Sequence, residues 1–150
     1  MTATLSVTRS LVIKAAPERV WEKLTNRDTI PQWLTEFHFT EFKPGTKFTT
    51  GEGDEAEPGE FVIIEPPRRF AFRWTAEQKR QGMTLVTITL EPVDHGTLVT
   101  VTESELELLE ADVLKSMFER NSTGWGLALA GLANLVEGKS DVSSDGTDNR

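Results

Sequence analysis

The stretch Gly124-Trp125-Gly126-Leu127-Ala128-Leu129-Ala130-Gly131-Leu132-Ala133-Asn134-Leu135-Val136 decides the fold of this chain. Trp125, Leu129, Leu132 and Val136 recur at i, i+4, i+7 and i+11, which is the spacing of one helical face. No charged residue interrupts the stretch, so it is predicted to be a buried helix that another layer of the protein covers. It is too short to cross a bilayer, which needs about 20 apolar residues.

A stripe of mostly small residues runs beside that apolar face, formed by Gly124, Ala128, Gly131 and Leu135. A glycine inside a helix costs roughly 1 kcal/mol relative to alanine. A compensating feature is therefore expected. Two are open: close approach of the helix backbone to a sheet, or space left for a ligand.

The rest of the chain is predicted to form an antiparallel sheet, with two short helices after its first strand. β-branched and alternating residues indicate the strands. Pro17 and Pro31 suit the first turns of the short helices, and Asp94-His95-Gly96 suits a hairpin turn. The predicted strands lie at 5–14, 37–42, 46–50, 61–65, 70–74, 82–90 and 99–102, the short helices at 16–24 and 30–34, and the last helix at 110–136 with a bend near 121–123.

Grouped strands with separate helices are typical of the α+β class, and one long helix must then cover a face of the sheet. The predicted fold is a curved antiparallel sheet of about six or seven strands wrapped on the C-terminal helix. A cavity is expected between the short helices and the sheet. We expect a single domain over residues 1–138 and a disordered polar tail over 139–150.

Composition narrows the classes of function. The net charge of −8 argues against binding to nucleic acid or to anionic membranes, because both are bound chiefly through Lys and Arg. The absence of cysteine excludes disulfides and thiolate chemistry. No apolar run follows Met1, so a cytoplasmic location is expected.

Few titratable residues suggest catalysis. His95 is predicted in an exposed turn, and His38 on a surface or edge strand, with a cavity acid or base as its alternative. Glu103 shares strand parity with Val99 and Val101, so it is a candidate general base or ligand anchor unless the strand ends before it. Arg9 has inward parity and is either a partner for a carboxylate or an exposed residue at the strand start.

No metal or cofactor site is predicted. The acidic run Glu52, Asp54, Glu55 and Glu57 lacks the spacing of a calcium loop, so a solvated loop is expected there. The sequence has no Gly-rich phosphate loop, zinc-ligand cluster or nucleophile elbow. We therefore assign no catalytic residue.

Aromatic and aliphatic residues are the better candidates, because small-molecule sites are largely apolar. The alternative is that the same residues form a filled core. The residues predicted to line a ligand cavity are Trp33, Phe48, Trp74, Val86, Ile88, Val99, Val101, Glu103, Trp125, Leu129 and Leu132.

Several local motifs, in order over residues 5–137, carry a family resemblance. They are Ala15–Trp21, Trp33, Pro58–Phe61, Pro66–Trp74, Val86–Leu90 with Gly96-Thr97, and Gly124-Trp125 with Leu129 and Leu132. In these motifs the chain resembles the family of the activator of heat-shock-protein-90 ATPase, within the START-like, helix-grip superfamily. Leu34 stands where many members have a second tryptophan, and Pro44-Gly45-Thr46 where paired glycines are usual; both changes alter the cavity mouth.

The resemblance implies the fold more firmly than the activity, because the superfamily includes lipid carriers, hormone receptors, cyclases and co-chaperones. We carry three hypotheses. The first is a module that binds an apolar, amphipathic or lipid-like small molecule between sheet and long helix, without a cofactor. The second is a co-chaperone-like domain acting on a heat-shock-90 protein. The third, a cofactor-free cyclase or hydrolase, is the least favoured, since Tyr, Cys and a cavity His are missing. Monomer and homodimer both remain open.

Overall fold

The structure of the protein is a computed structural model. It describes residues 6–51, 53, 56–75, 83–104 and 111–138, with the side chains of 75, 83 and 111–122 excepted. The tail predicted to be disordered, 139–150, and most of the acidic loop, Glu52, Asp54 and Glu55, lie outside the described residues.

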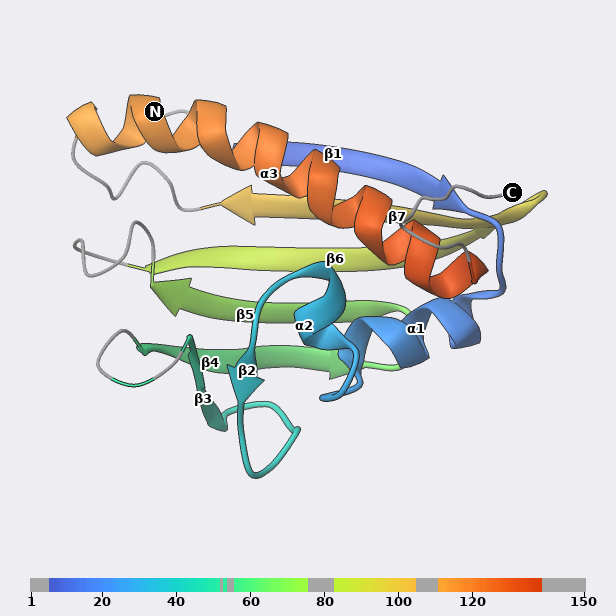
Figure 1. Cartoon of the computed structure of the whole chain (residues 1–150), viewed down its shortest axis with the longest axis horizontal. Helices are drawn as coiled ribbons and strands as arrows, with labels where there is room; N and C mark the ends of the chain where they lie inside the picture. The colour runs from blue at the N-terminus through green and yellow to red at the C-terminus, as the bar shows by residue number, and fades with distance from the viewer. Residues whose placement is uncertain (1–5, 52, 54–55, 76–82, 105–110, 139–150) are drawn as a thin grey trace.

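The sheet has seven strands in the order β1-β7-β6-β5-β4-β3-β2, and every neighbouring pair is antiparallel. The α+β prediction is therefore confirmed, because the helices are separate from the strands and lie over one face of the sheet (Figure 1). The strands are β1 Ser6–Ile13, β2 Phe37–His38, β3 Lys47–Thr50, β4 Glu57–Glu65, β5 Arg69–Thr75, β6 Met83–Val93 and β7 Gly96–Ser104.

In the described residues, three helices cover the sheet: α1 Pro17–Thr25, α2 Ile30–Trp33 and α3 Ala111–Glu137. Figure 1 shows α3 running obliquely across the face near β1 and β7, with α1 and α2 beside its second half. The bend expected near residues 121–123 does not divide the helix, which is continuous over its 27 residues. Polar and β-branched residues cost only fractions of a kcal/mol within a helix, so they do not have to end it.

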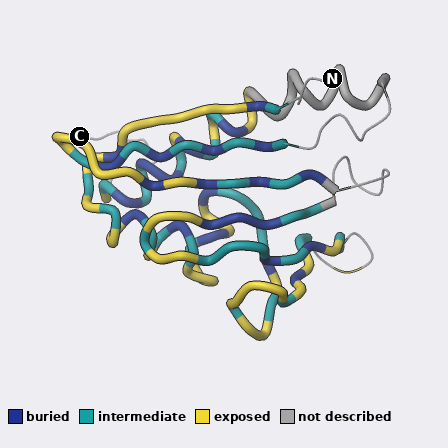
Figure 2. The backbone as a smooth tube through the Cα atoms, turned by 180° about the vertical axis from the view of Figure 1, so that it is seen from behind, coloured by how far each residue is buried: buried dark blue, intermediate teal, exposed yellow. Residues whose placement is uncertain are grey.

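The predicted inner face of α3 is buried as expected: Trp125, Leu129, Leu132 and Val136 are 4%, 1%, 0% and 1% exposed. Fully burying each large apolar side chain contributes roughly 1.5–3 kcal/mol. The strands show the matching alternation of buried and more exposed positions along the tube (Figure 2). The helix and the concave face of the sheet therefore share one core.

The end of α3 is tied to the start of the chain. The side chain of Arg19 in α1 donates from Nε to the carbonyl oxygen of Val136 at 3.0 Å. The backbone N–H of Lys14 donates to Glu137 Oε2 at 2.9 Å. These bonds satisfy one of the carbonyls that a helix leaves unpaired at its C-terminus, and they help to hold α3 in register against the sheet.

Candidate ligand-binding site

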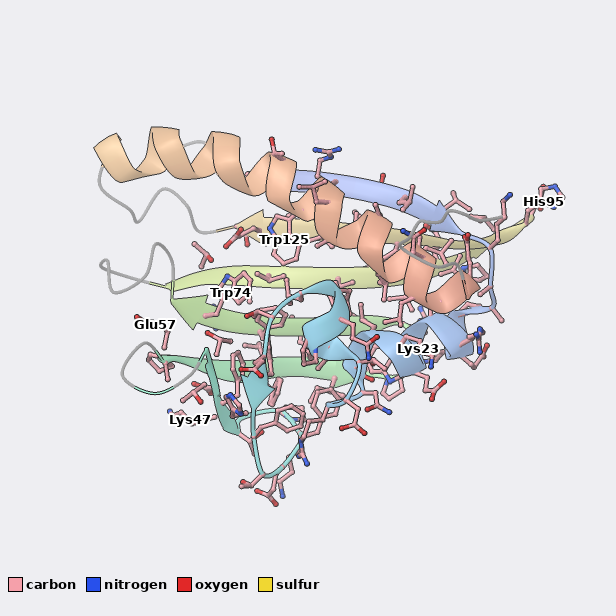
Figure 3. The ribbon with its side chains drawn as sticks, in the orientation of Figure 1. Lys23, Lys47, Glu57, Trp74, His95 and Trp125 are labelled. Carbon is pink, nitrogen blue, oxygen red and sulfur yellow. The ribbon has the colours of Figure 1, made fainter. Side chains whose placement is uncertain are left out.

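A cleft of about 370 Å³ opens between α2, β5 and α3. It lies toward the end of the sheet opposite the β6–β7 turn that carries His95 (Figure 3). Leu127 on its rim is 71% exposed, so the cleft is in contact with solvent. Its lining is apolar or aromatic apart from one glycine: Trp33, Leu34, Trp74, Gly124, Trp125, Leu127 and Ala128.

Two of the three tryptophans form a stacked pair across the two layers. Trp74 stands on β5 and Trp125 on α3, with ring centroids 5.7 Å apart and an angle of 26° between the rings (Figure 3). Trp125 is almost fully buried, whereas Trp74 is half-buried. Offset stacking at this distance is a favoured arrangement of aromatic rings. The pair makes one side of the cleft aromatic.

The carboxylate of Glu103 holds both rings in place. Trp74 Nε1 donates to Glu103 Oε2 at 3.0 Å, and Trp125 Nε1 donates to Oε1 at 2.9 Å. The hydroxyl of Thr84 also donates to Oε2. Glu103 is 0% exposed, and a buried carboxylate is stable only when hydrogen-bond donors replace the lost water. Glu103 is thus a positioning residue for the two indoles.

This arrangement bears on the two roles considered for Glu103, a general base and a ligand anchor. The strand continues to Ser104, so Glu103 keeps the parity of Val99 and Val101 and points into the core. Three donors already converge on its two oxygens. A carboxylate so engaged has little acceptor capacity left for a substrate proton.

Trp33 differs from the other two tryptophans in the cleft. The residue is 6% exposed and its indole Nε1 is buried. This nitrogen has no hydrogen-bond partner among the described residues. Leaving such a donor unpaired costs roughly 1–3 kcal/mol, and buried donors in folded proteins are rarely left so. Trp33 therefore has an unpaired hydrogen-bond donor that is buried from solvent, beneath the surface of the cleft.

Arg9 lies outside the cleft. It is exposed on the edge strand β1, and its guanidinium occupies the space where a Cβ on Gly126 would stand, 2.7 Å from Nη2. This accounts for one small residue in α3 by close approach. Gly124 is the contrasting case, because a Cβ there would meet nothing within 4 Å. The small residues of α3 thus have different surroundings: Gly126 lies against the Arg9 side chain and not against the sheet backbone, and Gly124 faces open space.

The structure brings only Trp33, Trp74 and Trp125 of the predicted set to the wall of the cleft, with Glu103 behind them. The other predicted residues are fully or almost fully buried and pack within the core cluster: Phe48, Val86, Ile88, Val99, Val101, Leu129 and Leu132. The filled-core alternative therefore describes most of the sheet face. The cleft occupies only the part bordered by Trp33, Trp74 and Trp125.

Sequence reasoning did not include Leu34, Gly124, Leu127 and Ala128 among the site residues. The signal for two of them was present, because Gly124 and Ala128 belong to the small stripe of the last helix. The family resemblance places Leu34 at the cavity mouth, whereas Leu127 has no comparable signal. An apolar residue at the mouth of a cleft is indistinguishable, in sequence, from an ordinary surface leucine.

A second cleft of about 600 Å³ is lined by Phe37 and Phe48, whose ring centroids stack 4.6 Å apart, and by residues around them. Two cations line it. Arg27 donates a 2.8 Å hydrogen bond to the carbonyl oxygen of Phe39 and lies 4.4 Å above its ring, and Lys47 lies 3.8 Å from Glu60. His38 lines this cleft and is exposed, 3.8 Å from Glu36. His95 is exposed in the β6–β7 turn (Figure 3).

Among the described residues, no three His, Asp or Glu side chains are grouped closely enough to hold a metal ion. No helix in the described ranges combines the length and apolar character needed to cross a membrane.

Comparison with known proteins identifies relatives by family and by fold. The model of a family described as "Activator of Hsp90 ATPase homolog 1-like protein" matches residues 14–137. Among curated proteins, none matches the sequence significantly.

Solved structures share the architecture over most of the chain. Protein MLL2253 from Mesorhizobium loti is 21% identical with a TM-score of 0.77, over 91% of this chain and 99% of that one. The Aha1 dimer protein from Colwellia psychrerythraea is 18% identical with a TM-score of 0.69, over 89% and 96%. DynU16, from the dynemicin biosynthetic locus, is 23% identical with a TM-score of 0.72 over 97% of this chain, which spans 51% of DynU16. At these identities the likeness establishes the helix-grip fold.

Proposed function

This chain belongs to the activator of Hsp90 ATPase homolog 1-like family, and from that premise we propose that it is a small-molecule binding module whose ligand occupies the tryptophan-lined cleft. The observation that carries the proposal is the stacked Trp74–Trp125 pair held by Glu103 beside an open, apolar space. A wall oriented by buried hydrogen bonds is pre-organised, and pre-organisation lowers the cost of binding.

The size and chemistry of the cleft support a compact, flat ligand. Its volume of about 370 Å³ is within the range of small-molecule sites, roughly 300–1,000 Å³. Burial of ligand apolar area supplies the affinity, at about 25 cal/mol per Å². The half-buried ring of Trp74, stacked on Trp125, offers an aromatic surface on which an aromatic ring can be placed more favourably than a flexible chain.

Gly124 gives the direct test, because its missing side chain leaves the cleft open. Gly124→Phe is expected to weaken binding of the hydrocarbon probe 2-isopropenylnaphthalene at least about tenfold, since about 60 Å² of lost contact is enough for that factor. The matched control is Gly124→Ala, which is expected to retain binding and to stabilise the helix by up to about 1 kcal/mol. Both measurements use quenching of tryptophan fluorescence and thermal melting. Equal probe affinity in Gly124→Phe and the wild type would contradict the proposal, as would no binding to the wild type.

The family match favours a second candidate, a co-chaperone-like domain that binds a heat-shock-90 protein. Such a domain would co-purify with that chaperone, and neutralising the acidic residues from Glu52 to Glu57 would weaken the complex. Filling the cleft at Gly124 would leave the complex intact. Capture of the chaperone by Gly124→Phe but not by the loop variant would favour this candidate over the ligand-binding one.

A further inference from the structure

The indole N–H groups of the stacked pair both point to Glu103, and this arrangement favours one electrostatic class of ligand. We propose that the cleft binds a flat aromatic cation, an N-alkylated or protonated heteroaromatic ring, which lies against the tryptophan side of the cleft. This inference rests on the proposed function and names the chemical class of its ligand. It is carried by the hydrogen bonds of Trp74 and Trp125 and by the charges around the cleft.

The N–H group is the most positive part of an indole, and in both rings of the pair it is occupied. Trp74 and Trp125 donate to the Glu103 carboxylate at 3.0 and 2.9 Å. The part of half-buried Trp74 that remains accessible therefore lies elsewhere on its ring. The face of an aromatic ring is negative, and a hydrogen bond to an anion polarises the donor further in that direction. The pair is thus suited to a cation.

The charges around the cleft act in the same direction. Among the described residues that line it, none is a lysine or an arginine. The carboxylate of Glu103 lies behind the two rings that it holds, where it attracts a cation and repels an anion. An anionic ligand would lose hydration without gaining a positive partner from these lining residues. The net charge of −8 also favours the approach of cations to the protein.

The apolar lining decides which kind of cation is suited. A compact ammonium ion is strongly hydrated, and entering an apolar site removes part of that hydration. A ring whose charge is spread over many atoms loses less, and it gains from burial of its apolar area and from contact with the indoles. Leu127 on the rim is 71% exposed, so a bound cation can stay partly hydrated.

The first test changes the charge at the rim of the cleft. Leu127 lines the cleft but is largely exposed, and lysine, glutamine and glutamate all suit a helix there. The probes are the cation 1-methylquinolinium and 1-methylnaphthalene, which has the same shape without the charge. Relative to Leu127→Gln, the dissociation constant of the cation should rise about threefold in Leu127→Lys and fall about threefold in Leu127→Glu. That of the hydrocarbon should stay nearly constant across the series.

Two controls accompany this series, with all affinities measured by calorimetry at physiological salt. Glu91→Gln changes the net charge by the same amount as Leu127→Lys, at an exposed position outside the cleft. Salt screens such a distant charge, so the affinity for the cation should change little. The anion 1-naphthoate is expected to bind the wild type more weakly than 1-methylquinolinium does.

The second test addresses the rings themselves without changing any other side chain. Protein is labelled with tryptophan that carries one fluorine atom on its ring and then with tryptophan that carries three. Fluorine withdraws electron density from the ring, so the cation should bind progressively more weakly, by about twofold to fivefold at the end of the series. The hydrocarbon should not follow the series. Trp21, which is also labelled, is not among the cleft-lining residues.

The outcomes separate the two claims. Binding of neither 1-methylquinolinium nor 1-methylnaphthalene overturns the proposed function. Equal responses of cation and hydrocarbon to the charge at Leu127, or an equal effect of Glu91→Gln and Leu127→Lys on the cation, overturn the cationic class while leaving the cleft as a binding site. Tighter binding of 1-naphthoate than of the cation does the same. Equal responses of both probes to fluorination overturn the contact with the tryptophan rings.

Discussion

Replacing Glu103 with glutamine is expected to lower the free energy of unfolding by about 2–4 kcal/mol, because it breaks a buried hydrogen-bond centre. The carboxylate accepts from Trp74, Trp125 and Thr84. A glutamine amide has one oxygen that accepts and one NH₂ group that only donates. Whichever way the amide is turned, at least one buried donor faces another donor.

Urea denaturation measures the stability change, and near-UV circular dichroism reports on the tryptophan pair. Glu103→Gln is expected to alter the near-UV signal, since the stacked Trp74 and Trp125 lose a shared anchor. The control is Glu91→Gln, at an exposed position of the neighbouring strand β6, where a change within about 0.5 kcal/mol is expected. Stability and spectrum both equal to those of the control would refute the positioning role.

The same variant addresses the enzyme hypothesis. If Glu103 were a general base, its replacement by glutamine would abolish turnover while leaving the melting temperature nearly unchanged. The observed geometry predicts the opposite, a clear fall in melting temperature, because the side chain already serves three donors. A cofactor-free cyclase or hydrolase would have to use other residues.

Replacing Gly59 with alanine is expected to destabilise the protein by about 3 kcal/mol, at the upper end of the cost of overpacking a core. A Cβ at this position would stand 2.3 Å from two ring carbons of Phe48 and 2.8 Å from the carbonyl oxygen of Arg73. The Phe48 ring cannot move aside easily, because it stacks on Phe37 and is 2% exposed. The glycine therefore provides the surface on which an aromatic ring lies.

Displacement of Phe48 by the added methyl group should also disturb Trp74 in the cleft. Gly59 is the register partner of Phe48 on one side and of Trp74 on the other. Phe37 and Phe72 also pack against Trp74, at centroid distances of 6.4 and 5.3 Å. Chemical denaturation of Gly59→Ala measures the loss, with Gly124→Ala as the matched control because a Cβ there meets open space. Similar stability of the two variants would show that Phe48 adapts to the added methyl group.

The filled-core and open-cavity interpretations of the aromatic residues each hold for a part of the sheet face. Phenylalanines dominate the part toward α1 and β4, where Phe61, Phe70 and Phe72 are 0–1% exposed. Tryptophans border the open part near α2 and the middle of α3. A phenylalanine can be enclosed completely, whereas an indole carries an N–H that needs a partner. The unpartnered Trp33 marks the place where that requirement is not met within the described residues.

The sequence by itself determined which side of each element faces inward. The spacing of Trp125, Leu129 and Leu132 predicted the buried face of α3. Strand parity put Glu103 on the side of Val99 and Val101 but left open whether the strand reaches it, and the structure shows that it does. These are local properties, because periods of 3.6 and 2 residues depend only on the backbone of one element. The predicted order of strands and helices is confirmed as well, because each element is recognised from its own local period.

Only the tertiary structure decided which inward-facing residues meet. Trp74, Thr84, Glu103 and Trp125 belong to four different elements, and their contacts depend on strand register and on the angle at which α3 crosses the sheet. The same geometry leaves the Trp33 indole without a partner in the described part of the chain. Periodicity contains no information about distances between elements, so the carboxylate shared by two tryptophans and the open cleft beside it could not be read from the sequence.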